Sequence, residues 1–509
     1  MPAEAGLCGR LRGFVAKPAE KGDNIRRRGL GKARFPRRLC GPAGLGRLGP
    51  DFKRGTTRER GEMTMAKGFT RRAFLKGTAI ACGATGLAPV AAPAVLAHAQ
   101  PNQRLGVAVI GAGGMGGYSV DCALEENLVA LVDVDENILA AVMRDKVKDR
   151  AKPKIFHDFR KMLDQCHRQI DVVLIATPDH THAPAAIRAI DLGKHTFCQK
   201  PLAHNIRECY ALAKAARDKK VLTQMGNQGQ FSEGMRRLAE YVEAGAVGAI
   251  LESHSILGRN FGGKGGRPPS KPVPPHLHWD QWLGPAPYRD YHDGLHPFHW
   301  RSWRHFGTGT IGDMACHNIN PVFWALKLGE VKRFSVTCLH STGGSEEMYP
   351  QDNVVLYEIP ARPGRPAAKV YVYDHAGLKP EIMKETEKKY NRQFGEFTLF
   401  VGQQGLIGSD ARIIPEDRHK EFPAPPRTYP RAHGHPVQDL YWCIKNGGVP
   451  ASNFPDAAAP LTALALCGHL AQFAGVGKKI EWDVEKMQCT NLPEINQYVS
   501  RTYRKGWEV

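Results

Sequence analysis

The sequence predicts an α/β protein whose N-terminal domain is a doubly wound parallel sheet. Three observations support this fold class. Short apolar runs alternate with helical stretches between residues 104 and 225, the first run ends in a Gly-x-Gly-x-x-Gly turn, and an acidic residue ends the second run. The 509 residues suffice for two sizeable cores, and a composition of 42% hydrophobic and 24% charged residues is typical of a globular protein.

The expected strands are short and rich in Val, Ile and Leu, as strands buried on both faces are. In such sheets ligands bind at the carboxyl ends of the strands, so the loops that follow them are the first candidates for a site. The expected strands cover residues 105–110, 128–132, 170–176, 195–198 and 221–225, and the expected helices between them include residues 183–192 and 206–219.

The turn after the first strand indicates a dinucleotide site. In Gly111-Ala112-Gly113-Gly114-Met115-Gly116, the first glycine permits a tight turn, the second allows backbone to approach a pyrophosphate, and the last allows helix and strand to pack closely. Asp133, at the end of the second strand, can accept hydrogen bonds from both ribose hydroxyls and would repel the 2′-phosphate of NADP. NAD is therefore favoured and NADP stays open, because Asp135 is a second candidate for this role.

Two further motifs complete a family pattern. The loop Thr177-Pro178-Asp179-His180-Thr181-His182 follows the strand at 170–176, and the turn Gln199-Lys200-Pro201 follows the strand at 195–198. With the glycine turn and Asp133, these motifs resemble the Gfo/Idh/MocA family (glucose–fructose oxidoreductase and inositol dehydrogenase) from Arg104 to the C-terminus.

The resemblance implies an NAD(P)-dependent oxidoreductase that acts on a sugar, polyol or glycoside. It implies a Rossmann domain over residues 103–227, and a C-terminal α/β domain over residues 228–509 with a large, mostly antiparallel sheet that forms homo-oligomers in many members. The substrate pocket would lie between the two domains. The expected cofactor contacts are Gly111, Gly113, Gly114, Met115, Gly116, Asp133, Thr177, Pro178, His180, His182, Gln199 and Lys200.

Three residues are the candidates for catalysis. Lys200 matches the lysine of the family's Glu-Lys-Pro turn and can stabilise negative charge on the substrate oxygen, although Gln199 replaces the glutamate and removes a counter-charge. The segment 307–317 resembles the family's Gly-x-x-x-Asp-x-x-x-His pattern. A helix from about Ile311 would place Asp313 and His317 on one face, with His317 as general base and Asp313 orienting it or binding substrate.

Other residues are expected to bind substrate rather than metal. Trp300 and Arg301 lie in an aromatic stretch before this helix and can stack on a sugar ring or bind its oxygens, and Lys200, Asp313 and His317 would contact substrate as well. The His180-x-His182 spacing lacks a regularly spaced acidic or Cys partner, so no metal site is expected. Residues 258–287 are expected to form a surface excursion near the pocket, and residues 457–473 a helix between the domains.

The N-terminal residues predict export. Residues 1–62 hold 16 Lys and Arg against 6 Asp and Glu, about half of the formal net charge of +20, and are expected to be disordered, with Met63 or Met65 as the true start. The high charge is therefore no indication of nucleic-acid binding by the folded domains. Residues 63–99 resemble a twin-arginine signal peptide, with Arg71-Arg72, a weakly apolar run, and a cleavage site at Ala97-His98-Ala99.

The expected compartment is the periplasm or another exported location, reached through the twin-arginine export machinery. Pro89 and Pro93 interrupt the apolar run, so no permanent membrane anchor is expected. Because free NAD is not expected to be replenished there, a tightly held cofactor is predicted. Two alternatives stay open beside the dehydrogenase: an NAD-dependent glycosidase acting by oxidation, elimination and reduction, and a non-catalytic sugar or nucleotide sensor.

Overall fold

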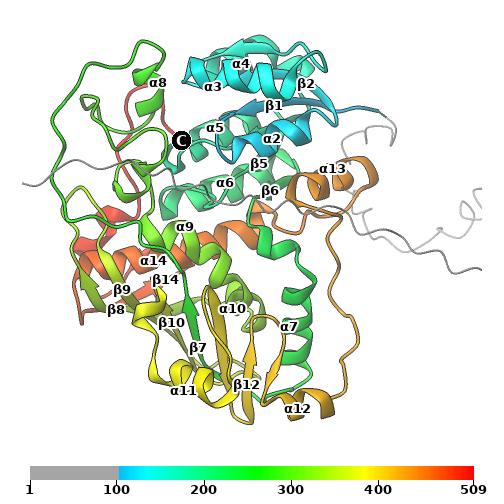
Figure 1. Cartoon of the computed structure of the whole chain (residues 1–509), viewed down its shortest axis with the longest axis vertical. Helices are drawn as coiled ribbons and strands as arrows, with labels where there is room; N and C mark the ends of the chain where they lie inside the picture. Colours follow the sequence, from blue (N-terminus) through cyan, green and yellow to red (C-terminus); the bar gives the residue numbers. More distant parts are fainter. Residues whose placement is uncertain (1–102) are drawn as a thin grey trace, which may run out of the picture. The chain divides into compact units, whose positions relative to one another are not determined.

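The computed structural model describes residues 103–509, so the predicted basic extension (1–62) and signal peptide (63–99) lie outside the described residues. Two sheets dominate this part of the chain (Figure 1). Short α-helices, 3-10 helices and two π-helical turns connect their strands. The predicted α/β fold class, with a parallel first sheet and a mostly antiparallel second sheet, is confirmed.

The first sheet has six strands in the order β3-β2-β1-β4-β5-β6, and every pair in it is parallel. This is the order of the doubly wound dinucleotide-binding fold, with its switch point between β1 and β4. The strands are β1 (Gly106–Ile110), β2 (Asn127–Val132), β3 (Lys154–Phe156), β4 (Val172–Ile175), β5 (His195–Cys198) and β6 (Thr223–Met225). All residues of β1 and β4 are buried, as their apolar sequences predict.

Two differences from the sequence-based expectation have physical reasons. β3 was not predicted, because this edge strand is only three residues long and two of them are exposed. Of the loop predicted at 177–182, only Thr177 and Pro178 lie outside a helix. The other four residues form the first turn of α5 (Asp179–Asp191), which runs through Pro184. Proline cannot donate to the carbonyl oxygen of His180, and Arg501 Nη2 donates to that oxygen at 2.6 Å instead.

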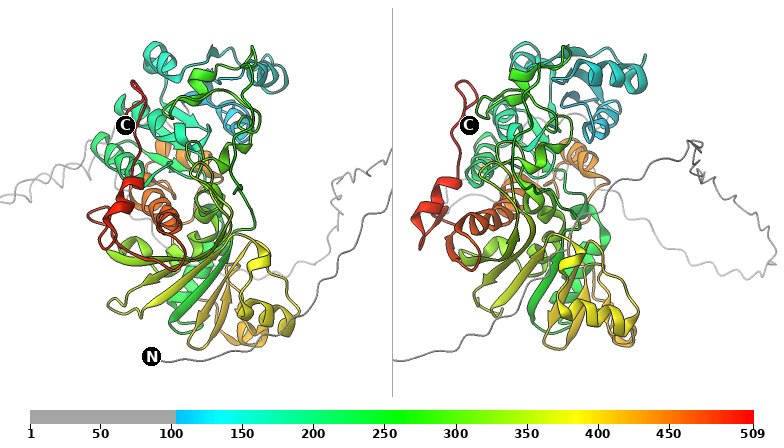
Figure 2. Two further views of the ribbon diagram at one scale, coloured as in Figure 1. Left: turned by 90° about the vertical axis from the view of Figure 1, so that its left-hand side faces the viewer. Right: turned by 60° about the vertical axis from the view of Figure 1, so that its left-hand side comes forward.

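The second sheet has nine strands in the order β13-β12-β11-β7-β10-β9-β8-β14-β15. The β7–β10 pair is parallel and the other pairs are antiparallel. Figure 2 shows these strands side by side, with the long α14 packed next to β8. The strands are β7 (Ile250–Ile256), β8 (Arg333–Thr342), β9 (Gln351–Ile359), β10 (Ala368–Tyr373), β11 (Phe397–Gly402), β12 (Gly405–Gly408), β13 (Ile413–Ile414), β14 (Lys479–Asp483) and β15 (Gln488–Cys489).

The remaining elements are helical. The α-helices are α2 (Gly116–Ala123), α3 (Glu136–Val142), α4 (Phe159–Cys166), α6 (Ile206–Lys219), α7 (Glu233–Glu243), α8 (Trp279–Leu283), α9 (Gly309–Asn318), α10 (Asn320–Ala325), α11 (Glu381–Tyr390), α12 (Glu416–Glu421), α13 (Pro436–Asn446) and α14 (Ala459–Ala474). The 3-10 and π-helical turns are η1 (Met143–Val147), η2 (His167–Gln169), η3 (Gln228–Phe231), η4 (His299–Ser302), η5 (Leu328–Glu330), η6 (Ala376–Leu378), η7 (Phe454–Ala458) and η8 (Pro493–Tyr498).

Two helices from the second half of the chain pack against the first half. Val437 and Leu440 of α13 lie in the same apolar core as β1 and β4, so residues beyond 227 complete the packing of the first sheet. α14 packs against α6 of the first half and against α9 and β8 of the second. Phe454–Ala474 is long and apolar enough to cross a membrane, but 72% of its apolar window is buried inside the protein, as in a core helix.

The cysteines contribute to the cores. Within residues 103–509 all nine are buried and none forms a disulfide. Burial raises the pKa of several of these thiols, Cys198 and Cys316 among them, which suits small core side chains better than nucleophiles.

Candidate active site

A cleft of about 720 Å³ opens at the carboxyl ends of the parallel strands. The loops after β1, β2, β4 and β5 form one wall, and residues from the second half of the chain, including Trp282, Trp300 and His317, form the other. Trp507, close to the C-terminus, also lines the cleft, where its ring packs against Phe159 and under the guanidinium of Arg160. The cleft therefore lies where doubly wound sheets bind dinucleotides.

The glycine turn has the shape that a pyrophosphate requires. Gly111 has φ +83°, and a Cβ there would lie 2.6 Å from the carbonyl oxygen of Ala176. A Cβ on Gly116 would lie 2.0 Å from the carbonyl oxygen of Gly111, so the helix can approach the strand only with glycine here. The backbone N–H groups of Gly114 and Met115, before the first turn of α2, have no acceptor among the described residues. These free donors at a helix N-terminus fit a dinucleotide phosphate.

Asp133 and Asp135 have different roles. Asp133 lines the cleft and is buried, and it accepts hydrogen bonds from the N–H groups of Ala112 (2.8 Å), Gly113 (3.3 Å) and Asp135 (3.0 Å). Burial raises the pKa of this carboxyl, and the three N–H groups oppose that rise. Asp135 instead caps α3 through Oδ1 and accepts from His296 Nε2 through Oδ2 (2.9 Å). Of the two carboxylates, Asp133 is the one that faces the cleft.

The excursion at 258–298 closes over the Asp133 end of the cleft. His278 N–H donates to the carbonyl of Val134 and Glu136 N–H to that of His276, so the excursion is joined to the loop after β2 by backbone hydrogen bonds. Trp279 and Trp282 of the excursion form a separate apolar cluster with Trp303 and Phe306, which follow it in the chain. Residues 258–276 of the excursion are exposed or half-buried, as predicted for a surface excursion. The part from Leu277 on, which contains the short α8, is packed and covers the cleft.

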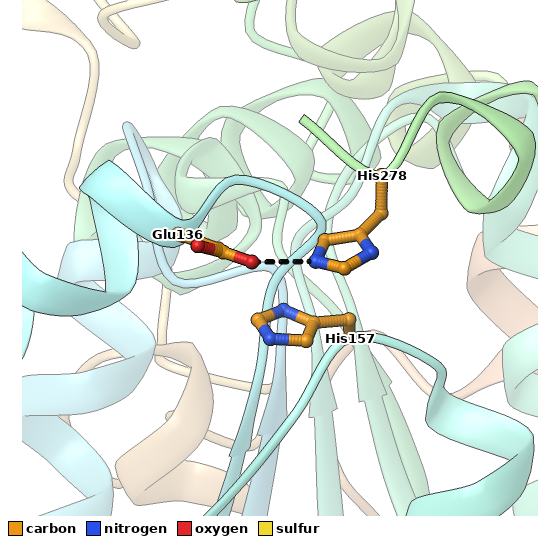
Figure 3. Close-up of side chains that lie close together, drawn as sticks. All are labelled: Glu136, His157 and His278. Carbon is orange, nitrogen blue, oxygen red and sulfur yellow. Dashed lines mark hydrogen bonds and ion pairs between the residues drawn. The ribbon is translucent and has the colours of Figure 1, made fainter. Parts of the chain in front are cut away.

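A cluster of two imidazoles and a carboxylate lies between this cover and the Rossmann side, with His278 from the cover, Glu136 from α3 and His157 from the loop after β3 (Figure 3). His278 Nε2 donates to Glu136 Oε1 at 2.9 Å, and the rings of His157 and His278 are stacked with centroids 4.0 Å apart and planes 16° apart. His157 Nδ1 donates to the carbonyl of Asp133. These contacts join the cover to the Rossmann side of the cleft.

Lys200, Asp313 and Arg301 form an ion-paired group across the cleft. Lys200 Nζ donates to Asp313 Oδ2 (2.9 Å) and to the Asp313 carbonyl (3.0 Å), and Arg301 Nε donates to Asp313 Oδ1 (3.2 Å). The Asp313 side chain is 5% exposed, against 16% for Lys200 and 20% for Arg301. One carboxylate of α9 therefore fixes a lysine of the first domain and an arginine of η4 at the same place.

His317 lies in the same wall of the cleft, one turn after Asp313 on α9. Burial, and then the charge of Lys200, lower the pKa of His317 to about 4, and the charge of Asp313 opposes this. The imidazole is therefore neutral at pH 7 and can accept a proton. The expected pairing with Asp313 is not formed, because Lys200 and Arg301 occupy both oxygens of that carboxylate.

The predicted cofactor contacts divide into two groups. Thr177, Pro178, Gln199 and Lys200 line the cleft, as do Gly111, Gly113, Gly114 and Met115. His180 and His182 do not: both are buried below it, and each contacts two backbone carbonyl oxygens through its ring nitrogens. The helical first turn of α5 turns these two side chains away from the cleft, so they support its wall.

Two features of the substrate end complete the site. Arg301 lies 4.2 Å from the ring centre of Trp300 and 4.5 Å from that of Phe298, and all three line the cleft. Asp179, which the sequence-based reasoning passed over, also lines the cleft, although it is 1% exposed. Its position directly after the Thr-Pro pair that follows β4 is the signal that identifies it, because side chains at strand ends face the ligand.

Comparisons with known proteins agree with this architecture. Residues 105–227 match the GFO_IDH_MocA model, an oxidoreductase family with an NAD-binding Rossmann fold, and residues 259–340 match the model of the C-terminal α/β domain of an oxidoreductase family, GFO_IDH_MocA_C2. The WlbA dehydrogenase of Chromobacterium violaceum, solved with NADH and UDP-GlcNAcA, has a TM-score of 0.51 at 16% identity, covering 75% of this chain and 97% of that one. This likeness concerns the fold.

Curated relatives match over shorter stretches. Levoglucosan dehydrogenase of Pseudarthrobacter phenanthrenivorans is 30% identical over 164 residues, 32% of this chain and 34% of that protein. A glycosyl hydrolase family 109 protein of Shewanella sp. (strain ANA-3) is 30% identical over 209 residues, 36% of this chain and 45% of that protein. The chain thus spans between about a third and just under half of the length of these relatives.

Proposed function

We propose that this chain, which belongs to the Gfo/Idh/MocA family of oxidoreductases, transfers hydride between a bound NAD and a hydroxyl-bearing carbon of a sugar, polyol or glycoside. The observation that carries the proposal is the convergence of Lys200, which is paired with the buried Asp313, and His317 in the cleft that also holds the glycine turn and Asp133. When bound, the cofactor supplies the hydride acceptor or donor.

The residues of the chain have separate tasks in this proposal. Gly114 and Met115 N–H groups would hold the pyrophosphate, and Asp133 would accept from the ribose hydroxyls. Neutral His317 removes the hydroxyl proton, and Lys200, held in place by Asp313, stabilises the negative charge that develops on the substrate oxygen. Arg301 and Trp300 would bind the polar and apolar faces of the sugar ring.

The test is single-turnover reduction of the bound cofactor. Mass spectrometry of the freshly purified, denatured protein identifies the nucleotide, and the absorbance of reduced nicotinamide then follows its reduction by a panel of sugars, polyols and glycosides. Lys200→Met should reduce the rate about 10²-fold. Lys214→Met, on the exposed side of α6, is the matched control and should leave it unchanged. Wild-type rates in the Lys200 variant would contradict the assignment.

We also propose that the protein is exported with its cofactor already bound. The support is the Arg71-Arg72 pair with the Ala97-His98-Ala99 cleavage pattern, together with a cover joined to the Rossmann side by backbone and side-chain hydrogen bonds. Replacing both arginines with Lys should leave an uncleaved precursor in the cytoplasm, seen by fractionation and immunoblotting. Normal export of that variant would exclude the twin-arginine route.

We also propose that the protein forms a homo-oligomer. Light scattering of the purified protein measures its mass in solution and therefore tests this.

A further inference from the structure

Asp179 is the first residue of α5, and its surroundings set it apart from the other carboxylates of the cleft. Its side chain is fully buried, yet the residue lines the cleft. One hydrogen bond reaches it, from Thr308 Oγ1 to Oδ2 at 2.7 Å. Within residues 103–509 no lysine, arginine or histidine lies within ion-pairing distance of it, whereas Asp313 pairs with two cations. A buried carboxylate without a cation is costly to ionise, so this group favours a proton.

Several charged and titratable groups act on Asp179. Burial, and then the charge of Asp313, raise its pKa to about 7, while the bond from Thr308 and the charges of Arg301 and Lys200 oppose this. At this value, a single charge added or removed nearby changes its protonation at neutral pH. Asp179 also acts electrostatically on Cys198, Cys316 and Tyr349, whose pKa values are raised by burial, so they stay neutral. Burial lowers the pKa of His180 to about 3 and those of His182 and His317 to about 4, so these imidazoles are neutral at neutral pH as well.

We propose that Asp179 holds the proton that each half-reaction releases or consumes: it is ionised while the bound nicotinamide is oxidised and protonated while it is reduced. This inference rests on the proposed function. The oxidised nicotinamide ring carries a positive charge and the reduced ring carries none. A cation at the Lys200 end of the cleft favours the carboxylate form of Asp179, and its loss favours the acid form.

The chemistry balances without a further reactant. A secondary alcohol, the oxidised cofactor and the Asp179 carboxylate give a ketone, the reduced cofactor and the Asp179 carboxylic acid. The alcohol loses a hydride to the cofactor and a proton that ends on Asp179. When a second substrate is reduced, the same proton returns to its oxygen. A cofactor that cycles without leaving the protein could thus work with little net exchange of protons with the solvent.

The test measures nucleotide affinity and needs no substrate. NAD⁺ and NADH affinities of protein stripped of nucleotide are measured by fluorescence and calorimetric titration from pH 6 to pH 8. Ionised Asp179 attracts the oxidised ring, so the affinity for NAD⁺ relative to NADH should rise with pH, by about tenfold if the cofactor charge shifts the Asp179 pKa by one unit. The histidines near Asp133 face the adenosine end of the nucleotide, which is the same in NAD⁺ and NADH. Their titration therefore affects both affinities equally and cancels in the ratio of the two.

Three variants make the outcome specific. In Asp179→Asn the ratio should not depend on pH, and in Thr308→Val, which removes the hydrogen bond to the carboxylate, the transition should move to higher pH. Asp374→Asn is the matched control: its pKa is also raised to about 7 by burial, but it bonds Asn353 far from the cleft, so the wild-type dependence should persist. If both nucleotides bind and the wild-type ratio is flat, the inference is wrong. If neither binds, the proposed function itself fails.

Discussion

Replacing Asp313 with Asn isolates the ion-paired group of the cleft. The substitution keeps the shape of the side chain but removes the negative charge that Lys200 (2.9 Å) and Arg301 (3.2 Å) share. With the three side chains only 5%, 16% and 20% exposed, solvent replaces little of the lost attraction. Breaking a buried ion pair costs about 3–5 kcal/mol, and because Asn retains one acceptor oxygen, we expect a loss of about 2–3 kcal/mol in the free energy of unfolding.

Urea unfolding, followed by tryptophan fluorescence and circular dichroism, measures this loss. The matched control is Glu485→Gln, which removes a carboxylate paired with Lys332 where both side chains are more than 60% exposed, and it should cost less than about 1 kcal/mol. The single-turnover rate of Asp313→Asn should also fall, by about 10²-fold, because Lys200 loses its position. A variant as stable as Glu485→Gln, or one that reduces its cofactor at the wild-type rate, would refute this account of the group.

Three further predictions concern other parts of the protein. His317→Gln should lower the single-turnover rate about 10²-fold with nucleotide content unchanged by mass spectrometry, and an unchanged rate would place the base elsewhere. Asp133→Ala should weaken NAD binding by about 2–3 kcal/mol and NADP binding less, as measured by fluorescence titration. Equal losses would point to damage of the glycine turn, because Asp133 accepts hydrogen bonds from the N–H groups of that turn. Burial lowers the pKa of His195 to about 4, and its Nδ1 accepts from Leu222 N–H, so its contribution to stability is present above its unfolded value of 6.5 and is lost as the pH falls toward 4. His195→Asn, whose amide oxygen can accept the same N–H without titrating, should reduce the loss of unfolding free energy over this range by up to about 3 kcal/mol, and an identical pH profile would contradict the prediction.

Much of the first domain is predictable because its signals are local. A buried parallel strand needs a short apolar run, and the glycine turn needs residues without a Cβ at Gly111 and Gly116, so both appear in consecutive residues. The observed helix α6 has the predicted bounds, 206–219. β3 escaped prediction because an edge strand of three residues, two of them exposed, has no apolar pattern to recognise.

The sequence was sufficient to identify the residues of the candidate site, but not to predict which of them pair with one another. Lys200, Asp313 and His317 were identified from their motifs, yet the sequence suggested that Asp313 orients His317. In the fold, 113 residues separate Lys200 from Asp313, and their ion pair claims one oxygen of the carboxylate while Arg301 claims the other. Helical spacing determines which side chains share a face, but it does not determine which side chain from another element arrives there.

The sequence by itself therefore determined the parallel sheet and the dinucleotide turn, because each depends on the spacing of neighbouring residues, and its resemblance to the family identified the candidate catalytic residues. Only the tertiary structure decided which charged side chains lie next to one another and which lack a partner. It turned His180 and His182 away from the cleft, placed the excursion at 258–298 over Asp133, and left Asp179 buried beside Asp313 without a cation. The physical reason is that burial and charge depend on distances between segments far apart in the chain, and these distances set the protonation of the site.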